Sequence, residues 1–189
     1  AGFGGGSSDA ARVLWGLNEL WETALGRDEL IKLGLQLGAD VPFFLLGCNA
    51  FAEGIGEILT PIELPPTSYL LINPGIHIPT VNVFKAPGLT RNHPKVTISD
   101  FTESAYSEQF GTNDCENVVI QQYQEVAHAI NWIIERHPSA KPRMTGSGST
   151  VFARLEPKIA QQLLEQLPSK WRGFVVQGLH RHPSYNPVS

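Results

Sequence analysis

The feature that most constrains this chain is a glycine cluster that leads directly into a helix pattern. Residues 2–8 read Gly-Phe-Gly-Gly-Gly-Ser-Ser, and apolar residues then recur at three- and four-residue steps, as on one face of a helix. Glycine allows the backbone to approach a ligand closely and to adopt positive φ. The first turn of a helix adds free N–H groups and the positive end of the helix dipole. Together these properties predict a phosphate-binding loop.

The glycine cluster matches neither of the common nucleotide-binding fingerprints. A dinucleotide fingerprint requires a third glycine where Ser7 stands, and an acidic residue about 20 residues later at the end of a second strand. The P-loop of NTPases requires Gly-Lys-Ser/Thr, whereas the first lysine of this chain is Lys32. A Gly/Ser run can also be a plain linker. A linker need not lead into a patterned helix, so the helix pattern favours a phosphate-binding loop without a lysine. Such a loop indicates that a phosphate binds, but it does not indicate which reaction takes place.

Composition restricts the class of protein and its partners. The chain has 189 residues, enough for one large or two small domains, and its 42% apolar and 17% charged residues are typical of a globular protein. A net charge of −4 without a basic stripe argues against nucleic acid as a partner. No apolar run is long enough to cross a bilayer, so we expect no membrane partner either.

The cysteines and histidines predict no metal site. Cys48 and Cys115 lie far apart and form no CxxC motif, so we expect free thiols in a reducing cytoplasm. The six histidines lack the spacing of metal ligands. His180 and His182 are predicted to belong to a mobile C-terminal tail.

Hydrophobic periodicity and turn signals predict an α+β chain of two domains. The rigid Leu-Pro-Pro-Thr stretch at residues 64–67 predicts a boundary between domains 1–65 and 66–189. The second domain is predicted to run β-α-β-β-α-β, the order of a ferredoxin-like sandwich. The first domain is predicted to contain helices followed by a hairpin of residues 50–53 and 58–62. The predicted elements of the second are a strand 69–73, a helix from Thr80, an irregular loop 86–112, a helix 116–136 with an inner face that includes Ile134, strands 142–145 and 150–155, a helix 157–167 and a strand 173–177.

Asp40 is the carboxylate that the sequence singles out. It directly precedes Val41-Pro42, which places it at the N-cap of a helix with proline in the first turn. A carboxylate within reach of an attacking hydroxyl can accept its proton during phosphoryl transfer. Spacing alone leaves two roles open for Asp40, a catalytic base and a plain helix cap.

Residues 145–150, Thr-Gly-Ser-Gly-Ser-Thr, form a second Gly/Ser turn between two predicted strands. Glycine suits a tight hairpin there, but small residues would also let a phosphate or another loop pack closely. Because Asp40 lies between two such turns in the sequence, we consider a phosphate-handling cleft between the domains.

Thr80 and Phe84 form a further candidate pair at the start of a predicted helix. The phenyl ring of Phe84 could stack on a flat ligand while Thr80 supplies a hydrogen bond. The spacing on its own favours the alternative that Phe84 is a core residue.

Six segments form an ordered set of motifs along the chain. They are GFGGGSSDAA at residues 2–11, LGADVPF at 37–43, AEGIGE at 52–57, Pro-Gly with Ile-Pro-Thr within 74–80, Asn-Asp at 113–114 and MTGSG at 144–148. In this order they closely resemble the 4-diphosphocytidyl-2-C-methyl-D-erythritol kinases, a family of the GHMP kinase superfamily that acts in non-mevalonate isoprenoid biosynthesis. The resemblance covers essentially the whole chain. It implies the GHMP two-domain architecture, here with a partial N-terminal domain and a ferredoxin-like C-terminal domain.

The resemblance also implies a reaction and a set of site residues. The expected enzyme transfers the γ-phosphoryl group of ATP, accompanied by Mg²⁺, to the 2-hydroxyl of the cytidine diphosphate-linked methylerythritol. Asp40 would be the base, and Thr80 and Phe84 would line the cytidine end of the substrate. The residues expected to hold the ATP phosphates are Gly2, Phe3, Gly4, Gly5, Gly6, Ser7 and Ser8. Those expected to support this loop are Thr145, Gly146, Ser147 and Gly148.

One part of the family pattern is not found in this sequence. The family carries a segment before the glycine loop, with a catalytic lysine, an adjacent asparagine and a Tyr-His pair for the cytosine, whereas this sequence starts within the loop at Ala1. We therefore expect an N-terminally truncated kinase, inactive as 189 residues alone. Two alternatives stay open, another GHMP kinase acting on homoserine or mevalonate, and a non-catalytic nucleotide-binding fragment.

Overall fold

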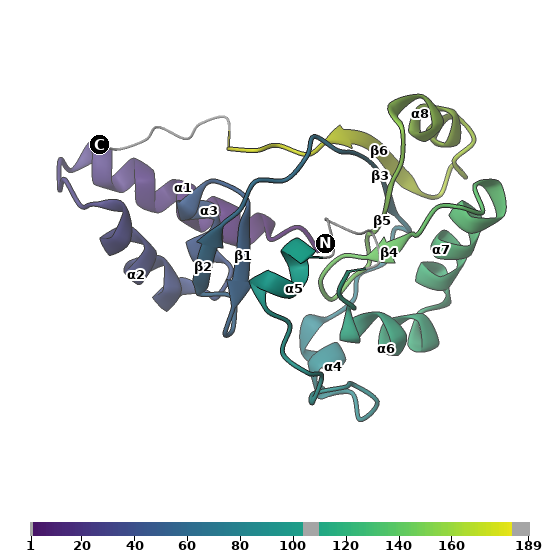
Figure 1. The fold of residues 1–189 in the computed structure, drawn as a ribbon, viewed down its shortest axis with the longest axis horizontal. Helices are drawn as coiled ribbons and strands as arrows, with labels where there is room; N and C mark the ends of the chain where they lie inside the picture. Colours follow the sequence, from purple (N-terminus) through teal and green to yellow (C-terminus); the bar gives the residue numbers. More distant parts are fainter. Residues whose placement is uncertain (1, 104–109, 183–189) are drawn as a thin grey trace. The chain divides into compact units, whose positions relative to one another are not determined.

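The computed structural model describes residues 2–103 and 110–182 and divides the chain into two units (Figure 1). The helical unit combines Gly4–Pro66 with Leu179–Ser189, and the sheet unit combines Ala1–Phe3 with Thr67–Gly178. The chain passes from one unit to the other inside the glycine cluster, after Phe3. The predicted domains 1–65 and 66–189 do not include this feature, in which each end of the chain belongs to the unit formed mainly by the other half. The feature depends on contacts between residues far apart in sequence.

The helical unit packs three helices around a small core. Its elements are α1 (Gly5–Leu20), α2 (Arg27–Leu37), α3 (Val41–Leu46), and the antiparallel hairpin of β1 (Ala50–Glu53) and β2 (Ile58–Pro61). The core consists of Ala11, Leu30, Val41 and Leu45, which are all almost completely buried. Helices α2 and α3 approach closely at Gly34, where an added Cβ would lie 2.5 Å from Leu45 Cδ1. The packing of α3 therefore depends on a few well-fitted side chains.

The sheet unit contains one four-stranded antiparallel sheet. Its strands are β3 (Ser68–Asn73), β4 (Arg143–Met144), β5 (Val151–Arg154) and β6 (Arg172–Gln177). Their spatial order is β4-β5-β3-β6. The first and third strands of the unit thus lie side by side in the centre, with the second and fourth at the edges. This arrangement is the split βαβ topology, and the predicted ferredoxin-like fold is confirmed.

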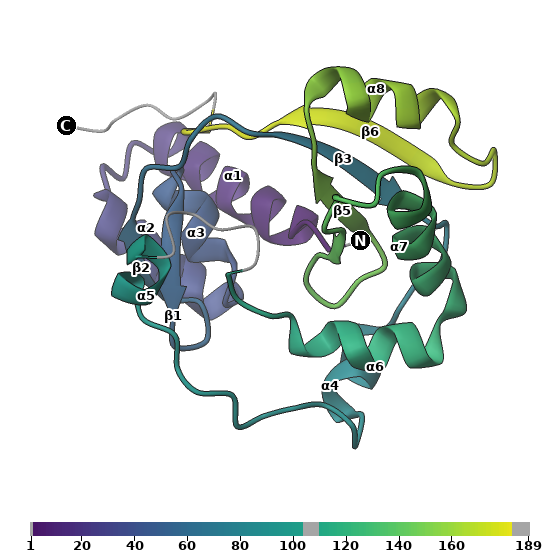
Figure 2. The same ribbon diagram turned by 45° about the vertical axis from the view of Figure 1, so that its right-hand side comes forward.

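Helices cover one face of this sheet. Helices α7 (Gln124–Arg136) and α8 (Pro157–Glu165) pack on its strands, and the unit also contains α4 (Thr80–Lys85), α5 (Ile98–Glu103) and α6 (Asp114–Gln122) (Figure 2). Strand β3 alternates buried and half-buried residues, and its buried Leu70 and Ile72 join the core with Ile133 of α7 and Leu163 of α8. This alternation is what a sheet covered on one face produces. None of the helices in the described ranges is long and apolar enough to cross a membrane.

Two predicted elements of the sheet unit differ from the structure. The predicted helix 116–136 is two helices, α6 and α7, separated at Tyr123, where φ is −129° and ψ is 89°. Ile134 was expected on the inner face but is 41% exposed, because it lies about 100° around α7 from the buried Ile133. The predicted irregular loop 86–112 contains α5, while its residues 104–109 lie outside the described part of the chain.

The prediction of a mobile tail is wrong for His180 and His182. Arg181 forms a β-bridge with Cys48, and the backbone N–H of His182 donates to the carbonyl of Gly47 at 2.9 Å. These long-range backbone bonds attach the segment to the helical unit. Residues 183–189, the rest of the predicted tail, lie outside the described ranges.

Candidate functional site

The glycine cluster forms the start of helix α1. Gly4 is the N-cap with φ of 61°, and the next four residues make up the first turn of the helix. The backbone N–H of Ser8 donates to the Gly4 carbonyl, whereas the three N–H groups before it receive no acceptor from the helix itself. The first turn contains no acidic side chain, and a Cβ added at Gly5 or Gly6 would meet no atom within 4 Å. This open, positively polarised turn can accept an anion.

Asp40 lies at the N-terminus of α3 but does not cap it. Its position before Val41 and Pro42 agrees with the prediction, yet its side chain makes no capping hydrogen bond and is exposed. The structure therefore removes the main argument for the plain-cap alternative. The carboxylate is available to accept a proton from a bound ligand.

The hairpin between β1 and β2 lies beside Asp40, a neighbour that the sequence analysis did not assign. A Cβ added at Gly56 would lie 3.5 Å from the Ala39 carbonyl oxygen and 4.0 Å from Asp40 Oδ1. Gly56 has φ of 113°, which disfavours any other residue there. The only signal in the sequence is the AEGIGE motif, which contains Gly56 without revealing what it contacts.

Helix α3 connects Asp40 with the start of α1. A Cβ added at Gly4 would lie 2.9 Å from Cε2 of Phe44, so the N-cap of α1 packs against the ring of Phe44. Phe44 follows Asp40 by four residues, which corresponds to a helix rise of about 6 Å. Two features predicted to serve one reaction, the open helix turn and the carboxylate, thus adjoin the same short helix of the helical unit.

In the sheet unit, the glycine cluster contacts the second Gly/Ser turn. The hydroxyl of Thr145 donates to the carbonyl of Gly2 at 2.8 Å. Gly2 has φ of 93°, and an added Cβ would lie 2.8 Å from the Thr145 carbonyl oxygen. Only glycine therefore fits this contact without displacing the backbone.

Thr80 joins the same turn. Its hydroxyl lies 3.0 Å from the hydroxyl of Ser147, so the two share a hydrogen bond. Phe84, on the same helix α4, is 58% exposed, and the interpretation of this residue as part of the core is wrong. The structure thus brings Gly2, Thr80 and the Thr145–Gly148 turn together in the sheet unit, while Gly4 to Ser8 and Asp40 belong to the helical unit.

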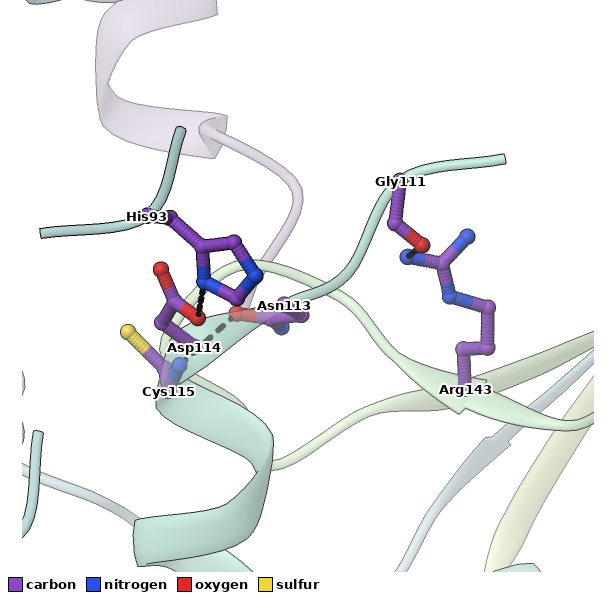
Figure 3. Close-up of polar contacts among 6 residues, drawn as sticks. All are labelled: His93, Gly111, Asn113, Asp114, Cys115 and Arg143. Atoms are coloured by element: carbon purple, nitrogen blue, oxygen red, sulfur yellow. Dashed lines mark hydrogen bonds and ion pairs between the residues drawn. The ribbon is translucent and has the colours of Figure 1, made fainter. Parts of the chain in front are cut away.

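The structure also reveals polar contacts at the start of α6 that the sequence analysis missed. Asn113 caps α6 and bonds to β4 and the turn that follows, and Asp114 Oδ1 lies 2.7 Å from His93 Nδ1 (Figure 3). Arg91 donates to the carbonyls of Phe84, Ala86 and Leu89 and so binds the C-terminal end of α4. The Asn-Asp motif at residues 113–114 was a sequence signal for the contacts of Asn113 and Asp114, but their partners lie about 20 to 30 residues away in sequence. In the described ranges no three His, Cys, Asp or Glu side chains gather into a metal-binding group.

Burial raises the pKa of the Cys115 thiol, and the neighbouring Asp114 carboxylate raises it further by repelling the thiolate. We therefore expect Cys115 to react with iodoacetamide at least about tenfold more slowly than an ordinary exposed thiol at pH 8. A Cys48→Ser variant leaves Cys115 as the sole thiol, and mass spectrometry over a pH series measures its alkylation. A midpoint at or below that of a free cysteine contradicts the prediction. Cys115→Ser, which keeps Cys48, is the matched control.

Two family models match the chain. The model described as the GHMP kinases N terminal domain matches residues 1–48, and the one described as GHMP kinases C terminal matches residues 98–173. The first range includes the glycine cluster and Asp40, and the second includes Asn113 and the Thr145–Gly148 turn.

Curated relatives and a solved structure match over nearly the whole chain. The chain is 49% identical to a 4-diphosphocytidyl-2-C-methyl-D-erythritol kinase of Polynucleobacter asymbioticus over 193 residues, covering 100% of the chain and 65% of the relative. It is 50% identical to the kinase of the same name from Ralstonia nicotianae, covering 96% of the chain and 63% of the relative. A crystal structure of a 4-(cytidine 5'-diphospho)-2C-methyl-D-erythritol kinase superposes with a TM-score of 0.77 at 33% identity, covering 94% of this chain and 66% of that one. The chain thus spans just under two thirds of the length of these proteins, and it belongs to the GHMP kinase family.

Proposed function

We propose that this chain forms the larger part of a kinase that transfers the γ-phosphoryl group of ATP to the 2-hydroxyl of 4-diphosphocytidyl-2-C-methyl-D-erythritol. The names of the relatives support this substrate. The observation that carries the proposal is the exposed carboxylate of Asp40, which makes no capping hydrogen bond. It lies at the N-terminus of α3, the helix whose Phe44 ring packs against the start of α1. An anion-binding helix start and a free carboxylate are the two groups that this reaction requires from the helical unit.

The reaction needs little covalent help from the protein. The substrate's 2-hydroxyl oxygen forms a bond to the γ-phosphorus, the bond from that phosphorus to the β-γ bridging oxygen breaks, and ADP leaves. The hydroxyl proton passes to the Asp40 carboxylate. The N–H groups of the first turn of α1 stabilise the negative charge of the phosphates. Mg²⁺ enters as part of the substrate MgATP.

The cytidine end of the substrate would be held by α4. The exposed ring of Phe84 offers a face on which a base can stack. The Thr80 hydroxyl, shared with Ser147, still has a lone pair to accept a hydrogen bond. Small-molecule substrates and a cytoplasmic location, the latter expected from the two isolated cysteines, complete the proposal.

An extended protein tests the function directly. We define it as this chain joined behind the N-terminal segment of the Polynucleobacter asymbioticus relative. The extended protein is expected to consume ATP only in the presence of the cytidine diphosphate-linked substrate, as followed by ³¹P NMR of the product. The 189 residues alone are expected to show no turnover above background. Turnover by those residues alone overturns this expectation, and an inactive but folded extended protein argues against the proposed reaction.

Two other functions are separated by the same assay. Faster turnover with homoserine or mevalonate would favour another GHMP kinase. Nucleotide binding without turnover on any of these alcohols by the folded extended protein would favour a non-catalytic nucleotide-binding fragment. The exposed aromatic ring of Phe84 favours the cytidine substrate, because neither small alcohol has a flat ring to stack on it.

A further inference from the structure

We propose that Asn113 is a positioning residue, whose side-chain amide holds the Thr145–Gly148 turn in the conformation that binds Gly2 and Thr80. The turn's importance for phosphate and substrate binding rests on the proposed function. The hydrogen bonds of Asn113 do not depend on it, and they can be tested separately.

Asn113 uses its side-chain amide in three hydrogen bonds. Nδ2 donates to the carbonyl of Met144 at 3.0 Å and to the carbonyl of Gly146 at 2.8 Å. Oδ1 accepts from the backbone N–H of Cys115 at 3.1 Å, which is the N-cap bond of α6 (Figure 3). A reversed amide would set Oδ1 against two carbonyl oxygens and Nδ2 against an N–H, so this orientation follows from the chemistry of the partners. A single side chain thus joins the start of α6 to both the strand before the turn and the turn itself.

The surroundings keep Asn113 in place. Arg143 on β4 donates to the carbonyls of Phe110 and Gly111, which holds the segment just before Asn113 against the sheet (Figure 3). On the other side, the carboxylate of Glu116 accepts the backbone N–H of Met144 at 2.6 Å. The segments before and after Asn113 are therefore both bound to β4. The two hydrogen bonds that its amide donates to the turn start from a fixed position.

The turn transmits this position to the residues expected to bind ligands. Thr145 donates its hydroxyl to the carbonyl of Gly2, and Ser147 shares a hydrogen bond with Thr80. Gly146, whose carbonyl Asn113 binds, lies between these two residues and has φ of 55°. Displacement of the Gly146 peptide would move both hydroxyls, because Thr145 and Ser147 are the direct neighbours of Gly146 in the chain. Asn113 thus controls a turn that contacts the glycine cluster and α4 together.

Replacement by aspartate separates the two roles of this side chain. Aspartate is as good an N-cap as asparagine, and it places negative charge favourably at a helix start, so Asn113→Asp keeps the bond to the Cys115 N–H. It has no N–H to donate, and its second oxygen would face the carbonyls of Met144 and Gly146. If Asn113 serves only as a cap, the variant should behave like the unchanged protein. If it positions the turn, the turn should loosen while α6 stays intact.

Hydrogen exchange of the 189-residue chain tests the positioning without reference to activity. In Asn113→Asp we expect exchange at the amides of Thr145 and Gly148, which donate to Thr150 and Thr145, to accelerate about tenfold to a hundredfold. Exchange in α6, at Val118 and Val119, should stay within about twofold. Asn131→Asp adds the same charge at an exposed position of α7 and is the matched control. Unchanged exchange at the turn overturns the proposal, as does equal acceleration in α6 and the turn.

Substrate kinetics of the extended protein test the consequence for binding. Asn113→Asp is expected to raise the KM values for both MgATP and the cytidine diphosphate-linked substrate by about tenfold or more, with a smaller change in kcat. A loss confined to kcat, or KM values unchanged from those of Asn131→Asp, contradicts the positioning role. An extended protein without Asn113→Asp that shows no turnover counts against the proposed function alone. In that case the hydrogen-exchange result still decides whether Asn113 holds the turn.

Discussion

Replacing Asp40 with asparagine is expected to lower kcat of the extended protein about 10²- to 10⁴-fold. The side chain keeps its size, but the amide cannot take up the proton of the substrate hydroxyl. Asp40 is exposed and makes no capping bond, so the replacement should leave α3 folded. The KM for MgATP should change little, because the first turn of α1, not Asp40, is expected to bind the phosphates. Initial rates at saturating substrate measure the effect.

Asp28→Asn is the matched control for this change. Asp28, like Asp40, is an exposed aspartate at the N-terminal end of a helix in the helical unit, but it lies in the first turn of α2 and is not part of the proposed site. The control should retain the turnover of the unchanged protein within about twofold. An Asp40→Asn variant with unimpaired kcat would remove Asp40 from the reaction and leave it without an assigned role.

Leu45→Ala is expected to destabilise the helical unit by about 2–5 kcal/mol, the range found for buried leucines. Leu45 is completely buried and is one of four residues that form the core of this unit. It also holds α3 against Gly34 of α2, and α3 carries Asp40 at its N-terminus. Hydrogen exchange of amides in α1 to α3 of the 189-residue chain measures the free energy of opening for this unit. The same experiment reports on the sheet unit, which should change little.

The control for Leu45→Ala is Leu37→Ala. Leu37 is the last residue of α2 and is 62% exposed, so its truncation should change the opening free energy by no more than about 0.5 kcal/mol. Equal effects of the two replacements would mean that Leu45 does not anchor α3. The position of Asp40 would then depend on something other than this small core.

Local signals made several elements predictable. The glycine cluster indicates the start of α1, and Asp40 before Val41-Pro42 indicates the start of α3. The apolar steps after the cluster indicate a helix but not its buried face, because Val13 and Leu20 are more than half exposed. The order of strands and helices after residue 66 was enough to predict the ferredoxin-like sheet. The break at Tyr123 had no such signal, because Val119, Tyr123 and Val126 are spaced as on one continuous helix.

The contacts of the site residues could be predicted only in part. The resemblance to a kinase family suggested that the Thr145–Gly148 turn supports the glycine cluster, but it gave no role to Asn113. That role depends on where Met144 and Gly146 lie relative to α6, about 30 residues away along the chain. The register of β4 on β5, in which Met144 faces Val151, sets the position of the turn and hence its partners.

The amino-acid sequence by itself determined the order of strands in the sheet unit, where α1 and α3 begin, and which residue types are available for phosphate and proton chemistry. These properties are local, because they depend on backbone preferences and on the period of apolar residues. The tertiary structure alone decided that the Asp40 side chain leaves its helix uncapped, that Phe84 is exposed, and that the Asn113 amide bonds to the carbonyls of Met144 and Gly146. Such outcomes depend on which distant groups packing brings within hydrogen-bond distance, and no local pattern encodes that distance.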